Sequence, residues 1–182
     1  MRRLILLVLL MVALPVAAFA AKQVDMGNNA GTLTGTDAGL TVPDSILTSV
    51  RNLYGSGLIT GNLGTVAFQT GALTSGSLQT GGTFGAGGAF TVTGNGSNGV
   101  ANGPIFTGTF YSDSTWQMFT LPDGTHNYNL TGIVTGIVYT KYKQYNAKGV
   151  TFQLTVNTGT GFFNGSIPLS SGNLNILCSP GY

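Results

Sequence analysis

Alternation of apolar and polar residues runs through most of the chain and predicts β-strands. The cleanest example is "VTFQLTVN" (150–157), in which every second residue from Val150 is apolar and the residues between are polar. A period of two places the apolar side chains on one face of a strand, so this face is expected to be buried. Similar runs predict shorter strands at 66–70, 77–80, 89–93, 104–112 and 114–121.

A turn and a long strand are predicted after residue 121. Pro-Asp-Gly at 122–124 favours a turn, because proline presets φ, aspartate bonds the nearby backbone and glycine accepts a positive φ. The strand beyond it is expected over 126–142, and apolar residues on both faces of 133–138 predict that both faces are covered. A second turn is expected at 144–149 ("QYNAKG").

Two segments near the N-terminus are less regular. Residues 44–54 carry apolar side chains at helical spacing but also weak helix formers, so a helix and a short strand both remain open. Residues 21–40 are polar and glycine-rich without a sustained period, and we expect them to form a mobile arm or an edge strand.

The spacing of strands and turns predicts one all-β, antiparallel, β-sandwich-like domain over residues 41–182. The alternative is a β-solenoid, because the dipeptide Thr-Gly recurs along the chain. Its intervals are irregular, whereas a solenoid needs a fixed period, so the sandwich is preferred. The many aromatic and β-branched residues argue against a disordered chain.

The first twenty residues, "MRRLILLVLLMVALPVAAFA", are predicted to be a cleaved signal peptide. A basic start is followed by an apolar run and by Ala18-Phe19-Ala20, which fits the A-x-A cleavage rule. The apolar run is shorter than the roughly 20 residues that span a membrane, so an uncleaved anchor is the weaker interpretation. The chain is therefore expected to be secreted, to the periplasm or outside the cell, with no membrane span after cleavage.

Removal of this segment leaves no surplus of charge. The 7 basic residues of the whole chain include Arg2 and Arg3, so 7 − 2 = 5 remain against 5 acidic residues. Nucleic-acid binding draws on the release of counterions by basic residues, so we expect no nucleic-acid partner. Cys178 is the only cysteine. It cannot form an intramolecular disulfide, which leaves burial at a strand end or a disulfide-linked dimer.

Several segments resemble a loosely defined group of proteins. The quoted runs are "LTSV", "GTVAFQTGALTSGSLQTGGTFGAGGAFTVTGNG", "FTGTF", "LPDGTHNYNLTG" and "GTGFFNGSIPLSSGNLNI". They look like segments of uncharacterised exported bacterial Gly/Thr-rich β-proteins. The resemblance covers most of the chain after residue 20, and it implies export and an all-β fold. It brings no known activity and no catalytic residue.

Catalytic and metal-binding residues are scarce. Asp113 and Asp123 are the only acids near aromatic residues, and both are expected at turns. A triad of His126, Asp123 and a serine is formally available, but no Gly-x-Ser-x-Gly elbow accompanies it. One histidine and one cysteine cannot supply the three or four ligands of zinc. Oxygen ligands for calcium occur over 25–37 without the spacing of a known loop. We expect no catalytic residue, metal or cofactor.

Aromatic residues are the best candidates for binding. Sugars stack on flat, exposed rings, and neighbouring lysines suit an anionic glycan or surface. The alternative is that the tryptophan belongs to the core and that the lysines only protect a solvated hairpin tip from edge pairing. The candidate binding residues are Trp116, Tyr139, Lys141, Tyr142, Lys143 and Tyr145, and Tyr139, Lys141, Lys143 and Tyr145 are expected to share one face.

These observations predict a secreted, non-enzymatic structural or adhesion-type module of a surface or matrix. Its expected partner is an extracellular polysaccharide or another surface polymer. A carbohydrate-binding module that uses an exposed aromatic face is the alternative, and a hydrolase of unrecognised type is the second alternative.

Overall fold

The computed structural model describes residues 23–170 and 172–177, and most of them belong to β-strands. The predicted signal peptide and Cys178 lie outside the described residues. The elements are β1 (Gln23–Asn29), β2 (Thr32–Thr36), β3 (Gly39–Arg51), η1 (Leu53–Gly55), β4 (Leu58–Gln69), β5 (Leu73–Ser77), β6 (Gly81–Phe84), β7 (Gly87–Asn95), β8 (Asn102–Phe110), β9 (Ser114–Thr120), β10 (His126–Tyr139), β11 (Gln144–Asn157), β12 (Ser166–Pro168) and β13 (Gly172–Leu177).

Eight strands form a continuous ring of hydrogen-bonded neighbours. Their order is β11-β13-β1-β3-β4-β7-β8-β10, and β10 also pairs with β11. Two short extensions leave this ring: β9, β6 and β5 continue from one half of β10, and β2 and β12 continue from one half of β3. All pairings in the described part of the chain are antiparallel, which excludes the β-solenoid alternative with its stacked parallel repeats.

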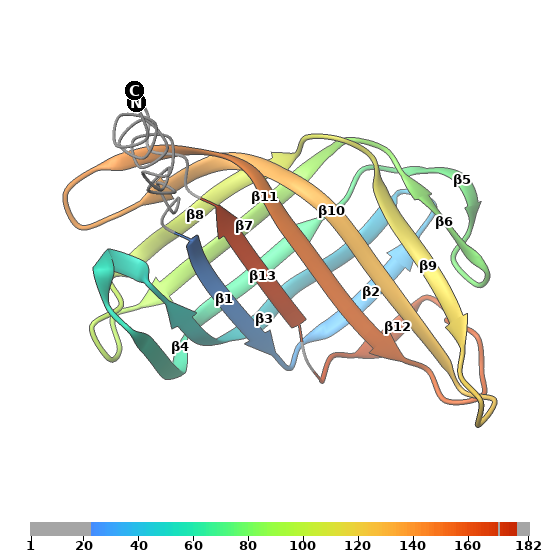
Figure 1. The fold of residues 1–182 in the computed structure, drawn as a ribbon. Helices are drawn as coiled ribbons and strands as arrows, with labels where there is room; N and C mark the ends of the chain where they lie inside the picture. The colour runs from blue at the N-terminus through green and yellow to red at the C-terminus, as the bar shows by residue number, and fades with distance from the viewer. Residues whose placement is uncertain (1–22, 171, 178–182) are drawn as a thin grey trace, which may run out of the picture.

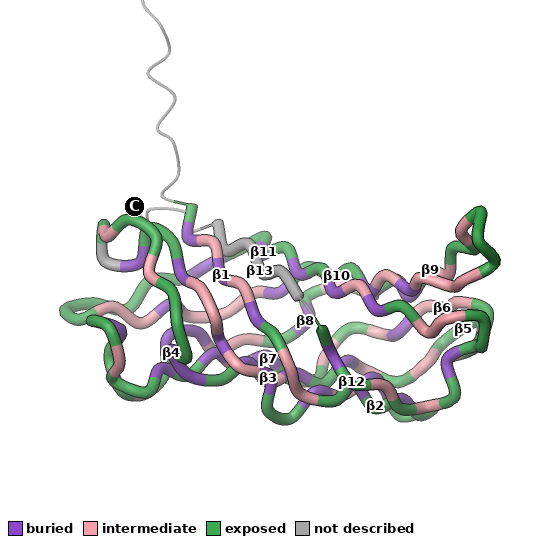
Figure 2. The backbone as a smooth tube through the Cα atoms, turned by 90° about the horizontal axis from the view of Figure 1, so that it is seen from below, coloured by how far each residue is buried: buried purple, intermediate pink, exposed green. Residues whose placement is uncertain are grey.

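The molecule is flattened into two layers. In Figure 1, β1, β13, β11 and β10 cross in front of β3, β4, β7 and β8 at an oblique angle. Figure 2 shows the molecule turned by 90°, with buried and exposed residues alternating along many of its strands. The predicted all-β, sandwich-like fold is therefore confirmed.

Phenylalanine rings fill the interior between the layers. Phe68 of β4, Phe90 of β7 and Phe152 of β11 are buried, and the centroid of the Phe152 ring lies 4.8 Å from that of Phe68 and 5.3 Å from that of Phe90. Phe110 adds an edge-on contact to each of these rings. Such tilted and edge-to-face pairs are favourable beyond the area they bury, so the cluster ties one layer to the other.

The strand β11 follows its predicted pattern. Val150, Phe152, Leu154 and Val156 are buried, whereas the residues between them are exposed or half-buried.

The strand β10 departs from its prediction, because only one face is covered. Val134 is buried, but Ile133 beside it is 41% exposed. The expectation that both faces of 133–138 are covered is therefore wrong, since the outer face of this layer meets solvent.

The N-terminal segment is not an arm or an edge within the described residues. The strand β1 lies between β13 and β3, and β2 lies between β3 and β12. Val24 and Met26 enter the core from β1, which binds this strand to the ring. The open choice over 44–54 resolves as strand through Arg51, followed by the short helix η1.

Two predicted boundaries are wrong for reasons of turn chemistry. Most of 77–80 forms the turn between β5 and β6, where Ser77 Oγ accepts a hydrogen bond of 3.0 Å from Thr80 N. Residues 144–149 belong to β11, and the turn lies earlier, at 140–143. There Lys143 N donates to Thr140 Oγ1 at 3.1 Å. The predicted turn at 122–124 is confirmed, with Gly124 at φ 82°.

Replacement of Phe152 by alanine is expected to lower the free energy of unfolding by about 3–5 kcal/mol, because a buried ring is lost from a cluster that cannot collapse onto the gap. Urea denaturation measures the change. Thr151→Ala, one residue away on the exposed face, serves as the control and is expected to cost less than about 1 kcal/mol. Similar costs for both variants would contradict a core centred on this ring.

Candidate functional site

Trp116 is unavailable to a ligand. It is 1% exposed, and its ring stacks on that of Tyr128 at a centroid distance of 5.0 Å. Its Nε1 donates a hydrogen bond of 2.9 Å to the carbonyl oxygen of Leu78, in the turn between β5 and β6. The place of Trp116 in an exposed aromatic face is therefore corrected: the alternation in β9 is real, but this face of the strand points inward.

Tyr128 completes this anchor. Its hydroxyl donates to the carbonyl oxygen of Gln79 at 2.6 Å and accepts from Phe163 N at 3.1 Å. The two large aromatic residues thus use their polar ends to hold a turn and a connecting segment. This is the usual role of a buried tyrosine or tryptophan whose polar atom needs a partner.

The remaining aromatic candidates do not form one surface. Val138 stands opposite Tyr145 in the ladder, so these two residues share a face and Tyr139 points to the other one. The hydroxyl of Tyr139 lies 3.1 Å from Thr107 Oγ1. The expectation of one face for Tyr139 and Tyr145 is therefore wrong, because the turn at 140–143 is shorter than predicted and sets a different register.

The tip of the β10–β11 hairpin presents one ring and two ammonium groups. Tyr142 is 83% exposed, and Lys141 Nζ lies 5.4 Å from the centroid of its ring. Lys143 is exposed in the same turn, where its backbone is held by Thr140. A single exposed ring with lysines beside it is a small feature compared with the set of aromatic candidates that the sequence predicts.

The polar residues of the hairpin between β9 and β10 have separate hydrogen-bond partners. Asp123 Oδ1 accepts from Thr125 N at 3.0 Å and from Thr125 Oγ1 at 2.8 Å. These bonds hold the pKa of Asp123 below its ordinary value of 3.8. His126 Nδ1 lies 3.2 Å from Thr120 Oγ1, and its ring stacks on Phe162. The structure thus gives Asp123 and His126 different roles in holding the turn, and it does not join them as a catalytic pair.

Among the residues that the structure describes, no group of three or more His, Cys, Asp or Glu side chains is placed to hold a metal ion. Asn28, within the segment considered for calcium, is buried and donates to Ser45 Oγ at 2.7 Å. Its amide serves the contact between β1 and β3.

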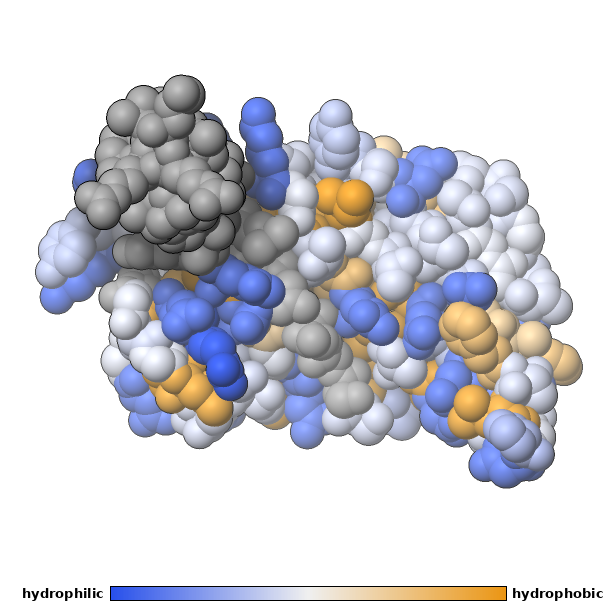
Figure 3. Space-filling model, viewed as in Figure 1, coloured by the Kyte–Doolittle hydropathy of each residue, from blue (hydrophilic) through white to orange (hydrophobic). Residues whose placement is uncertain are grey.

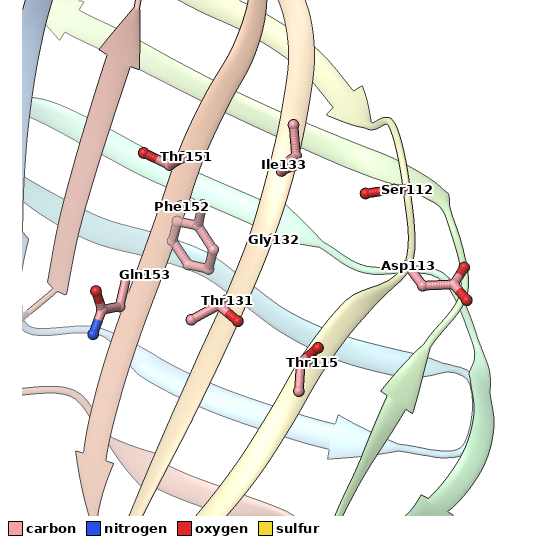
Figure 4. Close-up of a pocket in the computed structure, with 9 residues that line it drawn as sticks. All are labelled: Ser112, Asp113, Thr115, Thr131, Gly132, Ile133, Thr151, Phe152 and Gln153. Atoms are coloured by element: carbon pink, nitrogen blue, oxygen red, sulfur yellow. The ribbon is translucent and has the colours of Figure 1, made fainter.

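A pocket of about 430 Å³ opens on the outer surface of the front layer. Figure 4 shows its wall contributed by β9, β10, β11 and the connection between β8 and β9. Of its residues the sequence points only to Asp113, as an acid near aromatic residues, because the others form no motif. The lining residues are Ser112, Asp113, Thr115, Thr131, Gly132, Ile133, Thr151, Phe152 and Gln153.

The pocket exists because β10 changes partner. Its first half pairs with β9 through Thr131, and its second half pairs with β8 from Val134 onward. Gly132 and Ile133 lie between these ladders, and Tyr111 N donates to Ile133 O at 2.8 Å across the gap. The sheet therefore parts at this point and leaves a hollow between its two branches.

Gly132 is required at the parting of the ladders. A β-carbon on this residue would stand 2.7 Å from Ser114 Oγ and 3.0 Å from the ring of Phe110. Ser114 is buried, and its hydroxyl has no hydrogen-bond partner in the structure. The serine side chain thus occupies the interior space that a larger residue at 132 would need.

A surface of uncharged hydrogen-bonding residues surrounds the pocket. One row runs from Thr83 through Thr115 and Thr131 to Gln153, since these residues stand opposite one another on β6, β9, β10 and β11. Figure 3 shows pale and blue colours over much of the front layer, with orange confined to separate spots. We call the two adjacent rows the neutral face, which consists of Thr83, Thr115, Gln117, Asn129, Thr131, Gln153 and Thr155.

Comparison with known proteins identifies no relative. No family model, no curated protein and no solved structure matches the chain. In the described ranges, no helix has the length and apolar character that crossing a membrane requires.

Gly132→Ala is expected to lower the free energy of unfolding by about 1–3 kcal/mol, because the added methyl group overpacks the interior against Ser114. Ser114→Ala removes an unpartnered hydroxyl and is expected to leave stability unchanged or to raise it. In the double variant, Gly132→Ala should cost less than it does alone, which denaturation of the four proteins of the cycle measures. Strictly additive effects would contradict the close approach of the two residues.

The pKa of the Asp123 carboxyl is expected to lie below 3.8 and to rise in Thr125→Ala, which removes one of its hydrogen-bond donors. A lowered pKa in the folded state stabilises the turn above the unfolded pKa, and this contribution is lost as the pH falls through the folded value. Carboxyl carbon shifts followed by NMR during an acid titration measure the pKa. Thr120→Ala, which leaves both Asp123 bonds in place, is the control; an equal rise there would contradict the assignment.

Proposed function

We propose that this protein is a non-enzymatic, adhesion-type module of an extracellular surface or matrix, and that the neutral face is the surface with which it attaches to an extracellular polysaccharide. The observation that carries the proposal is the register of the neutral face. Thr115, Thr131 and Gln153 stand directly opposite one another on three adjacent strands. Strands lie about 4.8 Å apart, so the side chains repeat at a fixed spacing.

One pair of the neutral face, and the pair beside it on the same ladder, are held by side-chain hydrogen bonds. Thr155 Oγ1 donates to Asn129 Oδ1 at 2.8 Å, and Asn157 Nδ2 donates to Asn127 Oδ1 at 2.6 Å in the next pair along the same ladder. Groups that are ordered before binding lose little conformational entropy on binding, which favours attachment through many weak contacts.

The chemistry of the neutral face suits a polymer rich in hydroxyl groups. Hydroxyl and carboxamide groups both donate and accept hydrogen bonds, as do the hydroxyls of a polysaccharide. The face contains no charged side chain, so screening by salt has little to act on. Charged residues make up only 7% of the whole chain, which fits a partner recognised by hydrogen bonding.

Carbohydrate binding at the hairpin tip is the second candidate function. Its support is the exposed ring of Tyr142 with Lys141 beside it. The burial of Trp116 removes the largest ring from that hypothesis. An unrecognised hydrolase has less support again, because Asp123 and His126 have separate hydrogen-bond partners.

The purified protein is expected to sediment with insoluble polysaccharides such as cellulose, chitin or a β-glucan, and to remain bound when the ionic strength is raised. The variant Gln117→Lys/Thr155→Lys places charge on the neutral face outside the pocket, and it should reduce the bound fraction about tenfold, because each buried ammonium would lose hydration without a partner. Sedimentation followed by quantification of the bound protein measures the effect.

The matched control is Thr65→Lys/Thr93→Lys, on exposed positions of β4 and β7 in the other layer. Equal loss in both variants, or release by salt, would contradict attachment through the neutral face. If Tyr142→Ala abolished binding to the polysaccharide while Gln117→Lys/Thr155→Lys had no effect, the binding function would belong to the hairpin tip.

A further inference from the structure

We infer that the pocket at the parting of β8 and β9 is a subsite for one unit of a neutral sugar, held by the uncharged polar residues of its lining. This inference rests on the proposed function, because the pocket opens within the neutral face and shares Thr115, Thr131 and Gln153 with it. It assigns to the face a defined place at which a single sugar ring is recognised.

The size of the pocket fits a small ligand. Its volume of about 430 Å³ falls within the range of about 300–1,000 Å³ that is usual for small-molecule sites. Its walls come from β-strands and from a connection that is itself bonded to β10. The hollow is therefore present without a ligand and needs no movement of a lid.

Asp113 lies at the rim of the pocket, and Figure 4 shows its carboxylate pointing away from the other lining residues. Its Oδ1 accepts a hydrogen bond of 3.2 Å from Ala86 N, which fixes the carboxylate, and the residue is exposed. Asp113 therefore places a fixed negative charge beside the pocket, and the uncharged residues of the lining are the ones that meet a ligand.

The charge of the pocket selects against acidic ligands. Asp113 is the only charged residue among those that line it. A uronic acid or a phosphate would bring a second negative charge close to this carboxylate without a cation to balance it, which is unfavourable at short distance. A neutral sugar meets no such repulsion.

The other lining residues match the two kinds of surface that a sugar ring has. Ser112, Thr131 and Gln153 supply groups that donate and accept hydrogen bonds, as its hydroxyls require. Ile133 supplies the apolar part, and it is 41% exposed on an otherwise polar face. An exposed isoleucine at this place offers contact to the C–H groups of a ring.

Tyr111 adjoins the rim of the pocket. It precedes Ser112 in the chain, its backbone is bonded to Ile133, and it is 73% exposed. An exposed tyrosine beside a polar hollow offers a flat ring for a neighbouring sugar unit of the same polymer. Its contribution is expected to be smaller than that of the lining residues, because it lies outside the pocket lining.

Titration of the isotope-labelled protein with glucose, galactose, N-acetylglucosamine and cellobiose, followed by amide NMR, tests the inference. At least one of these probes should shift the amides of Thr131, Gly132 and Thr151 with a dissociation constant in the millimolar range or below. Glucuronic acid should bind more weakly than glucose. Asp113→Asn, which removes the negative charge beside the pocket, should bring the binding of glucuronic acid closer to that of glucose.

A pocket-filling variant provides the second arm. Thr131→Trp is expected to abolish binding, and its control is Thr65→Trp, an exposed threonine of β4 away from the pocket, which should leave the dissociation constant unchanged. Aromatic residues are well tolerated at exposed strand positions, and the amide spectrum shows whether each variant is folded.

The outcomes separate this inference from the proposed function. Absence of shifts at the pocket with all four neutral probes would overturn the subsite, as would tighter binding of glucuronic acid than of glucose. If polysaccharide retention is lost in Gln117→Lys/Thr155→Lys while the pocket gives no response, the subsite fails and the neutral face stands. If the pocket binds sugars while the unaltered protein does not sediment with any polysaccharide, the attachment function fails and the subsite stands.

Discussion

Hydrogen bonding between β10 and β11 is the interaction on which the rest of the structure depends. It extends over most of the length of both strands, which lie side by side in the front layer. It also completes the ring that continues through β13, β1, β3, β4, β7 and β8. Each strand of the ring then has partners on both sides, so its backbone groups are satisfied and its side chains alternate between interior and solvent. Within the described residues, only β5 and β12 have a strand neighbour on one side alone.

The same constraint separates the chemistry of the two surfaces. The interior takes most of the described phenylalanines together with Trp116 and Tyr128, whose polar atoms bind backbone carbonyl groups. The exterior takes threonine, asparagine and glutamine, which suit a strand and also hydrate well. The pocket lies where the pairing of β10 is interrupted, because β10 pairs with β9 as far as Thr131 and with β8 from Val134 onward.

The sequence predicted those features that depend on local pattern. The buried face of β11 and the turn at 122–124 follow from alternation and from the needs of proline and glycine. The position of β1 could not be predicted in this way, because its partners β3 and β13 are chosen by long-range pairing and Gly27 weakens its apolar pattern. Alternation also cannot tell the inside of a strand from the outside when both faces carry apolar residues, which is why the sequence left Trp116 open between a binding surface and the core. The pocket has no local signal at all.

The place of β1 has a consequence for the order of events during folding. The first strand of the described chain is flanked by β13, the last one, so the ring cannot close until nearly all of the polypeptide is available. Pairings between residues so distant in sequence carry a large entropic cost before they contribute stability, and such topologies fold slowly. During synthesis, one edge of β1 must therefore wait unpaired until β13, the last described strand, is available.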